Sequence, residues 1–348
     1  MKERMLGVLA AAAFLAASVL TINLGGDIAW RIAALQADAG PAERPPHAAG
    51  APAPGPVDPA KLKPAERELY ERIVREAKAL RAEPIDARND PVWKAIPGLN
   101  GLEVDIDATF RKAAAQGATE PIPFVFREIP ARVTLDDLGP LPIYKGNPRK
   151  PMVALMINVA WKEENLPDML RTLREENVKA TFFLLGAWLK DHPEEAKAIA
   201  AEGHEIGNHA YWHKTPLSLL SAAAVRKEIA DTQQLIKETL GTDSALFAPP
   251  AGDYSGETVR IAAELGLRTI LWTLDTIDWK EPPPASIVRK IRLRAEPGSL
   301  ILMHPTESSR RALRDVIREV KSRGLALGTV SETISPSRLS VVEPLPGF

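Results

Sequence analysis

The chain has 348 residues, with 44 Lys and Arg against 45 Asp and Glu and a formal net charge of −1. This balance leaves no basic excess to neutralise a nucleic-acid backbone, so no nucleic-acid partner is expected. Hydrophobic residues make up 45% and charged residues 26%, which is typical of a globular protein. Because cysteine is absent, disulfides and thiolate chemistry are excluded, and any metal must be held by His, Asp or Glu.

Residues 1–31 form the first recognisable segment. A short charged start is followed by an apolar run from Met5 to Leu24, and about 20 residues are enough to cross a bilayer. We expect a signal anchor, with a cleaved signal peptide and a buried hydrophobic helix as alternatives. The basic N-terminal flank favours a cytoplasmic N-terminus. The chain would then lie in the cell envelope, at the outer face of the cytoplasmic membrane, with that membrane as a partner.

Residues 32–64 are rich in Ala, Pro and Gly and contain few large apolar side chains, so they read as a linker. A helical pattern begins at Ala65, where apolar residues recur every three or four positions. Turn signals at 97–98 and 100–101 then interrupt an irregular stretch. We expect a small α/β module over 65–148.

Short apolar runs alternate with amphipathic helical stretches over residues 150–335, and residues 336–348 form a C-terminal tail. This alternation predicts parallel strands joined by crossover helices, in either an incomplete β/α barrel or an open doubly wound sheet. In a barrel, the chemistry gathers at the carboxyl ends of several strands. The unusual residues sit at such ends, which favours the barrel: Asn158, His209, Pro249, Pro250, Asp275 and His304.

Five of the six histidines lie in this region. His209 and His213 are four residues apart, and on a helix such a pair could hold one metal ion, although the spacing alone is weak evidence. His192 and His204 read as structural or surface residues. His304 ends a strongly apolar strand, so a role in proton transfer competes with that of a buried core histidine.

Five motifs in this order, "ATFFLLG", "GHEIGNHAYWH", "FAPPAGDY", "WTLDTIDW" and "LILMHP", resemble the polysaccharide deacetylases with NodB homology, carbohydrate esterase family 4. The first-motif region, "INVAW", resembles the sporulation-associated branch. The resemblance implies a distorted (β/α)7 barrel. It also implies hydrolysis of the acetamide C–N bond of N-acetylated glycan, such as peptidoglycan or chitin, with a divalent metal, zinc in the first instance.

The resemblance also implies roles for individual residues. The metal histidines would be His209 and His213, and the general acid would be His304, tuned by the carboxylate of Asp278. Trp279 and Leu302 would line an apolar pocket for the acetyl methyl group. Pro249 and Pro250 match the paired prolines of the third motif and would lie on the substrate side.

The first and third motifs depart from the family pattern. Asn158 stands at the position of the general base and Val159 at that of the third metal ligand, while Ala248 and Ala251 replace the usual Arg and Tyr. An amide cannot take a proton from water, and a base of this kind contributes roughly 10²–10⁴-fold in rate. With two protein ligands instead of three, the metal is expected to bind weakly or not at all. The amide oxygen at 158, or one of three nearby carboxylates, could compensate: Glu163, Glu164 or Asp275.

Residues 93–138 resemble, more loosely, a peptidoglycan-binding module found beside some envelope transpeptidases; a packing or spacer module is the alternative. Two functions therefore remain open for the whole chain. One is a membrane-tethered, metal-dependent deacetylase of cell-wall glycan. The other is a catalytically inactive glycan-binding or scaffold protein of the envelope, which keeps the groove but does not turn over its ligand.

Overall fold

The computed structural model describes residues 55–117 and 121–338. The expected signal anchor, most of the linker and residues 339–348 lie outside this part of the chain. Within it, no helix combines the length and apolar character that crossing a bilayer requires. The described residues form two compact units: a small unit, up to Glu83 and over Gly101–Ile129, and a barrel unit, over 84–100 and from Pro130 onward.

The barrel unit is built on an eight-stranded sheet in which all pairings are parallel. The strand order is β10-β11-β5-β6-β7-β8-β9, with β12 paired to β5. Because β9 and β10 stand at opposite ends of this order, the sheet is an incomplete barrel, as expected. Its strands are β5 (Met152–Val159), β6 (Thr181–Leu184), β7 (Glu205–Asn208), β8 (Leu246–Phe247), β9 (Arg268–Thr269), β10 (Leu274–Asp275), β11 (Leu300–Met303) and β12 (Ala326–Gly328).

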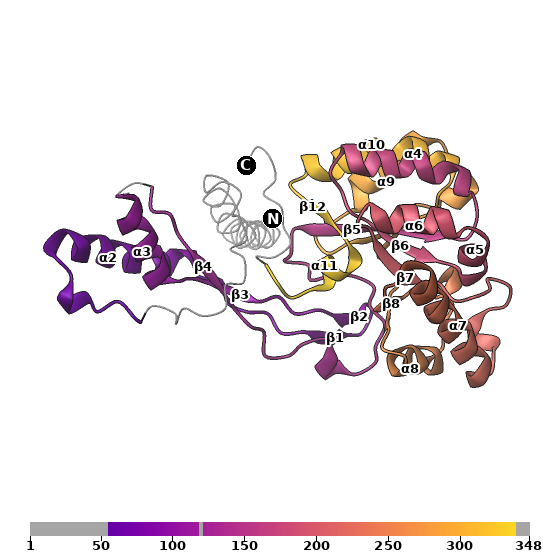
Figure 1. The fold of residues 1–348 in the computed structure, drawn as a ribbon, viewed down its shortest axis with the longest axis horizontal. Coiled ribbons are helices and arrows are strands. Elements are labelled where there is room, and N and C mark those ends of the chain that lie inside the picture. The colour runs from indigo at the N-terminus through magenta and orange to yellow at the C-terminus, as the bar shows by residue number, and fades with distance from the viewer. Residues whose placement is uncertain (1–54, 118–120, 339–348) are drawn as a thin grey trace, which may run out of the picture. The chain divides into compact units, whose positions relative to one another are not determined.

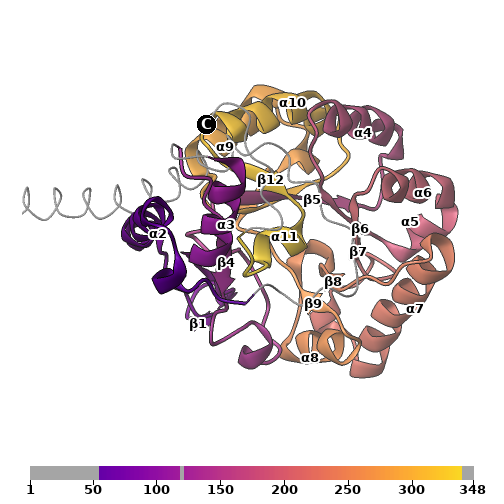
Figure 2. The same ribbon diagram turned by 60° about the vertical axis from the view of Figure 1, so that its left-hand side comes forward.

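Helices surround the curled sheet (Figures 1 and 2). Each crossover helix presents an apolar stripe to the strands; on α10, Leu313, Val316, Ile317 and Val320 are fully buried. Side-chain oxygens cap the longest helices, with Ser221 bonded to Ala224 N at the start of α7. The helices are α4 (Leu166–Glu175), α5 (Gly186–Asp191), α6 (Pro193–Ala201), α7 (Ala222–Leu240), α8 (Gly256–Glu264), α9 (Pro284–Arg294), α10 (Glu307–Ser322) and α11 (Val330–Ile334).

The core of the barrel unit has two layers, separated by the alternation of side chains along each strand. On β5, the odd-numbered residues, Val153 to Val159, pack in the layer between sheet and helices. Ala154 and Met156 pack instead inside the barrel. The same alternation on β11 sends Leu300 and Leu302 inward and Ile301 and Met303 outward. Position in the strand therefore decides which side chains can reach the barrel mouth.

Residues that precede β5 complete the barrel unit, which extends beyond the boundary expected near 148–150. They include the antiparallel pair β1 (Arg88–Asp90) and β2 (Lys94–Ile96). Ile143 forms a parallel bridge with Ile270, just after β9, and Lys145 bridges Ser299, just before β11. The segment over 143–145 thus bonds to both sides of the opening in the sheet, and its buried Ile143 belongs to the inner core layer.

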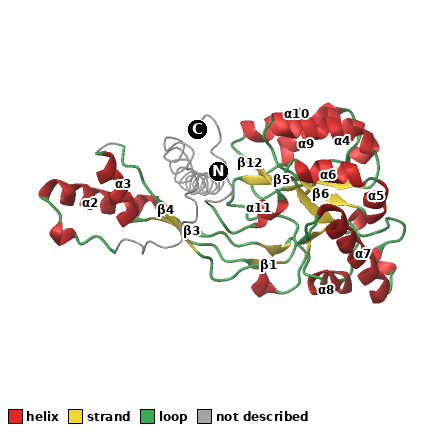
Figure 3. Cartoon of the chain, viewed as in Figure 1, coloured by secondary structure: helices red, strands yellow, loops and turns green. Residues whose placement is uncertain are grey.

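The small unit contains two helices and a two-stranded antiparallel sheet (Figure 3). Its elements are a short 3-10 turn at Pro59–Lys61, α2 (Pro64–Ala77), β3 (Gly101–Val104), α3 (Ile106–Gln116) and β4 (Phe126–Ile129). The periodic stretch expected from Ala65 is α2, whose Ile73 is fully buried beside Phe110 of α3. Asp105 caps α3 through Ala108 N, and Gly117 ends it in the left-handed conformation.

Candidate functional site

Three side chains from three strand ends meet at the carboxyl edge of the sheet. Asn158 lies two residues after Met156 on β5 and therefore faces the same side of the sheet as Ala154 and Met156, the barrel interior. His304 directly follows β11 and lies two residues after Leu302, which also faces the interior. His209 comes directly after β7 and is 1% exposed. Because the strands are parallel, their carboxyl ends open on the same rim, and these residues share one barrel mouth.

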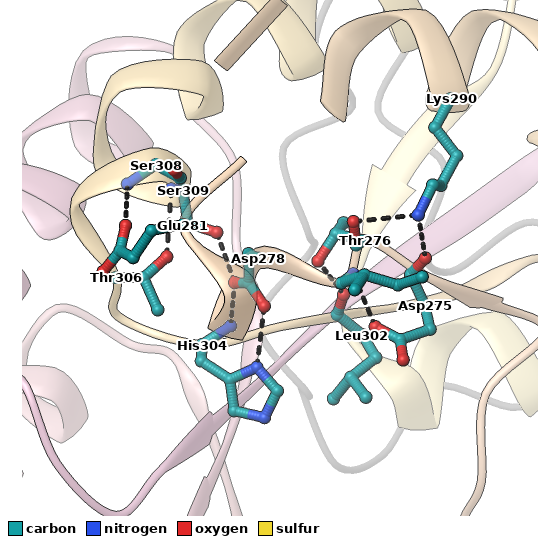
Figure 4. A network of polar contacts seen from close by, with 11 residues as sticks. Asp275, Thr276, Asp278, Glu281, Lys290, Leu302, His304, Thr306, Ser308 and Ser309 are labelled. Atoms are coloured by element: carbon teal, nitrogen blue, oxygen red, sulfur yellow. Dashed lines mark hydrogen bonds and ion pairs between the residues drawn. The ribbon is translucent and has the colours of Figure 1, made fainter. Parts of the chain in front are cut away.

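His304 and Asp278 form a buried ion-pair geometry at this mouth (Figure 4). The Nδ1 atom of His304 lies 2.8 Å from Asp278 Oδ1, and the backbone N–H of His304 donates to Oδ2 at 2.6 Å. Ser309, in the first turn of α10, donates its hydroxyl to the same Oδ2. Asp278 is fully buried. Since Nδ1 donates to the carboxylate, Nε2 of His304 is left to act at the mouth.

His209 and His213 lie on a loop between β7 and α7 rather than on a helix, which corrects the expectation from their spacing. Ala210 turns the chain with φ +60°. The loop is held by Glu228 of α7, which accepts from Tyr211 N and Trp212 N at 3.1 and 2.7 Å. The two imidazole centroids are 5.8 Å apart, so the turn brings the rings together without helical geometry.

The electrostatics of His209 indicate that three imidazoles converge. The pKa of His209 is lowered to about 3, mainly by burial and to a smaller extent by the charges of His213 and His304. The Ala248 carbonyl, 2.7 Å from Nδ1, opposes this shift. His209 is therefore neutral over the physiological range, with Nδ1 bonded to the carbonyl.

The strand end at β5 carries no carboxylate. Asn158 is 3% exposed, and its Oδ1 atom has no hydrogen-bond partner among the described residues. Val159 is fully buried and packs in the apolar layer between sheet and helices. A Val side chain has no lone pair to offer, and this one lies among hydrocarbon groups.

Aromatic side chains surround the mouth. Trp279 is 51% exposed and carries Lys280 over its ring, while Leu302 is buried on the inner face of β11. Pro249 and Pro250 are buried where the chain leaves β8. Trp161, just beyond β5, stacks on His304 with ring centroids 5.1 Å apart. The sequence alone had not singled out Trp161, because its partner is distant in the chain.

A groove of about 390 Å³ adjoins His213. Its lining comes from the ends of β5 and β6, from α5 and from the histidine loop, and includes Trp161, Trp188, Trp212, Glu163, Asp191, His192 and Lys214. This volume is within the range of small-ligand sites.

The comparisons with known proteins identify the family. Residues 145–270 match the family model described as polysaccharide deacetylase. The peptidoglycan-N-acetylglucosamine deacetylase of Bacillus cereus is 32% identical over 56% of this chain and 72% of its own length. The chain belongs to the polysaccharide deacetylase family.

Two further relatives align with a larger share of this chain. The uncharacterized protein YlxY of Bacillus subtilis is 42% identical over 78% of this chain and 85% of its own length. The crystal structure of BA3943, described as a CE4 family pseudoenzyme from Bacillus anthracis, superposes with a TM-score of 0.73 at 39% identity. The alignment covers 78% of this chain and 97% of BA3943. A mutant of BA3943 is described as having restored enzymatic activity.

Deacetylases of this family depend on a metal, but the side chains of this chain do not fit a three-ligand site. Among the described residues, no group of three His, Asp or Glu side chains is placed to hold an ion. One of the carboxylates expected to compensate is engaged elsewhere, because Asp275 accepts from Ile277 N at 2.7 Å. A second, Glu163, lines the groove with its Oε1 atom 3.9 Å from Nε2 of His192. The donor set therefore consists of two imidazoles and, at most, an amide oxygen.

The two histidines read as structural or surface residues have different environments. His204 is 6% exposed, and its Nδ1 accepts from Ala180 N at 3.2 Å. Burial lowers the pKa of His204 to about 4, and its ring packs against that of Phe182, with centroids 5.1 Å apart. His192 instead lines the groove and stacks on Trp188, with ring centroids 5.2 Å apart. This position in the groove could not be read from its sequence context.

Proposed function

We propose that this chain binds N-acetylated cell-wall glycan, such as peptidoglycan, at the barrel mouth without hydrolysing it. The observation that carries the proposal is the end of β5, where a neutral amide and a buried Val occupy the positions of the family's base and third metal ligand. Without a base, the attacking water keeps its proton. With two imidazoles, a metal lacks its usual third protein ligand.

The remaining features of the mouth suit ligand binding. Leu302 gives the mouth an apolar surface, and Trp279 presents an exposed ring. An indole ring offers a flat apolar face on which a sugar ring can stack, and its N–H can meet a hydroxyl group. The description of BA3943 as a pseudoenzyme supports the absence of hydrolysis.

Metal-dependent deacetylation is the second candidate function. It is favoured by the intact Asp278–His304 pair, which a protein that only binds would not require. It is also favoured by the unpartnered Asn158 Oδ1, a buried acceptor at the mouth. In that reaction, His304 would donate a proton to the leaving amine, and its hydrogen-bonded Asp278 would stabilise the imidazolium.

Three measurements on the purified full chain test the proposal: zinc content, acetate release from N-acetylglucosamine oligomers, and affinity for those oligomers by calorimetry. We expect affinity without stoichiometric zinc and without acetate. Near-stoichiometric zinc with acetate release would establish the second function. Absence of glycan affinity would overturn the first.

A charge-restoring variant provides the positive arm of this test. In this triple variant, Asn158→Asp restores the base, Val159→Asp restores the third metal ligand, and Ala248→Arg restores the positive charge that pairs with the base. It is expected to raise zinc affinity by orders of magnitude. The matched control keeps the other two changes but carries Val159→Asn, which is equally polar and lacks the charge. If both variants bind zinc equally, position 159 does not supply the ligand.

We also propose that the protein acts in the cell envelope. Support comes from the apolar run over residues 5–24 and from the relatives named peptidoglycan deacetylases. Fractionation of cells that express the full chain tests this location; recovery in the cytoplasm would contradict it.

A further inference from the structure

The groove beside His213, here called the tryptophan groove, is defined by Trp161, Trp188, Trp212, Glu163, Asp191 and Lys214. Its indoles come from three separate segments: the end of β5, helix α5 and the histidine loop. Trp161 and Trp212 are 38% and 44% exposed, which is unusual for such large apolar side chains. Exposed aromatic faces around a concave site are typical of ligand binding.

One of the side chains that line this groove, Trp188, contains a buried polar atom without a partner among the described residues. Trp188 is 4% exposed, and its Nε1–H has no acceptor among the described residues. A buried donor without a partner costs about 1–3 kcal/mol, so such donors are rare unless a ligand or water satisfies them. A hydroxyl or ring oxygen of a sugar is an acceptor of the required kind.

The charges of the tryptophan groove favour a cationic ligand. Glu163 and Asp191 contribute two carboxylates, Lys214 contributes one ammonium group, and the imidazoles of His192 and His213 also line the groove. This ammonium lies over the Trp212 ring, 4.0 Å from its centroid. The contact shows that the indole face already accepts a cation, because the negative ring face attracts one. An incoming ammonium group could take the same place if Lys214 moved aside.

We propose that the tryptophan groove binds an amino sugar with a free ammonium group, so that the protein recognises partly de-N-acetylated glycan. This inference rests on the proposed glycan-binding function. The sugar ring lies against the exposed indoles, and its ammonium group pairs with Glu163 and Asp191. The groove is next to the mouth, because His213 and Trp161 line it and Trp161 stacks on His304.

Calorimetry on the full chain tests the proposal with three tetramers of equal length: fully N-acetylated, half de-N-acetylated, and fully de-N-acetylated glucosamine. We expect the half de-N-acetylated tetramer to bind about tenfold more tightly than the fully N-acetylated one. The difference should shrink as salt rises towards about 1 M, because exposed charge pairs are screened.

Variants assign the preference to the groove. Glu163→Gln with Asp191→Asn should abolish the tenfold difference between the half de-N-acetylated and the fully N-acetylated tetramer. The control Glu164→Gln, next in the chain but outside the groove lining, should leave the difference intact. Lys214→Met should strengthen binding of the de-N-acetylated tetramer, because a competing cation is removed.

Two results would overturn the inference. One is a wild-type chain that binds the fully N-acetylated tetramer at least as tightly as the other two. The second is a preference that survives the double substitution. Either result leaves the proposed function standing if N-acetylated glycan still binds, whereas failure to bind any tetramer overturns both.

Discussion

Asp278 is a fully buried carboxylate that accepts three hydrogen bonds, two from His304 and one from Ser309. These contacts orient the imidazole and compensate the buried charge. The pair therefore has a structural role in addition to any role at the mouth. This second role explains how it can persist where the base and the third metal ligand are absent.

Truncation of this imidazole is expected to affect stability more than binding. His304→Ala removes one of the three donors to Asp278 and leaves its buried charge less compensated, so unfolding should become easier by about 2–3 kcal/mol. Affinity for N-acetylated glycan should stay within about twofold, because most contacts at the edge of a binding site contribute little to the binding free energy. Any deacetylation should vanish. Urea unfolding and calorimetry measure these effects. Adding Asp278→Asn should recover part of the stability; a loss of glycan affinity in a folded His304→Ala variant would show that His304 contacts the ligand.

The buried histidines predict how stability depends on pH. Burial lowers the pKa of His209 to about 3 and that of His204 to about 4, below the ordinary value near 6.5. Between these values the unfolded chain binds more protons, so stability decreases as pH falls below about 6.5. By pH about 4.5, each histidine should cost on the order of 2 kcal/mol. Urea unfolding across this range should give a shallower slope for His209→Gln; an unchanged slope would contradict the burial argument.

At the scale of elements, the packing of strand β7 beside β6 depends on Gly207. A Cβ atom there would lie 2.2 Å from the Phe183 ring, which fills the barrel interior from β6. The two residues are direct register partners. Phe183 can therefore occupy the interior below the mouth only because its neighbour has no side chain.

Gly207→Ala is expected to destabilise the barrel unit by about 2–3 kcal/mol, since the displaced ring has no free space to enter. Thermal unfolding measures the loss, and glycan affinity should fall with it because β7 leads into His209. Gly256→Ala is the matched control. It lies at the start of α8 with nothing within 4 Å of its added Cβ, so it should be neutral. Equal stability of the two variants would mean that Phe183 can repack.

The histidine loop shows why an element can be misassigned. The spacing of His209 and His213 is that of a helix face, but Glu228 of α7 accepts from two loop N–H groups between them, and Ala210 has a positive φ. The N-terminus of α5 also donates to this loop, through Gly186 N and Ala210 O at 2.8 Å. These tertiary bonds replace the helical ones.

At the scale of the whole molecule, the barrel unit recruits residues from the N-terminal half of the chain. Ile143 is 2% exposed, and its backbone bonds to Thr269 and Leu271 at the open edge of the sheet. An unpaired sheet edge is a site for aggregation. The segment over 143–145 covers this edge, so it belongs to the barrel unit physically even though it precedes the first barrel strand.

A pair of truncated chains tests this organisation. A chain that begins at residue 149 should aggregate or lose cooperative unfolding, because Ile143 and its bonds are missing. A chain over residues 84–338 with 101–129 replaced by Gly-Gly should unfold cooperatively. The two ends of the removed segment, Gly101 and Ile129, are register partners in the β3–β4 pair, so a short linker can join the flanking residues. Circular dichroism during heating and size-exclusion chromatography measure both. Equal behaviour of the two chains would mean that the covered edge is dispensable.

The parallel pairing of the strands and the residues at their ends could be predicted from the sequence, but the order of the strands could not. Alternating apolar runs and amphipathic helices specify parallel strands, and parallel strands bring their carboxyl ends to one rim. Asn158, His209 and His304 could therefore be assigned to one mouth. Trp161 could not, because it stacks on His304, which is distant in the chain. The contact of His192 with Trp188 is local, four residues apart, but only the tertiary structure shows that both line the groove.

The sequence by itself determined the family and the chemistry missing from the first motif, since a Val and an amide lack the required groups in any conformation. Only the tertiary structure decided that Val159 packs in the apolar layer, that the histidine pair lies on a loop, and that a segment before β5 bonds to the open edge of the sheet. The reason is physical. Residue identity sets what a group can donate or accept, whereas long-range packing sets which groups it meets.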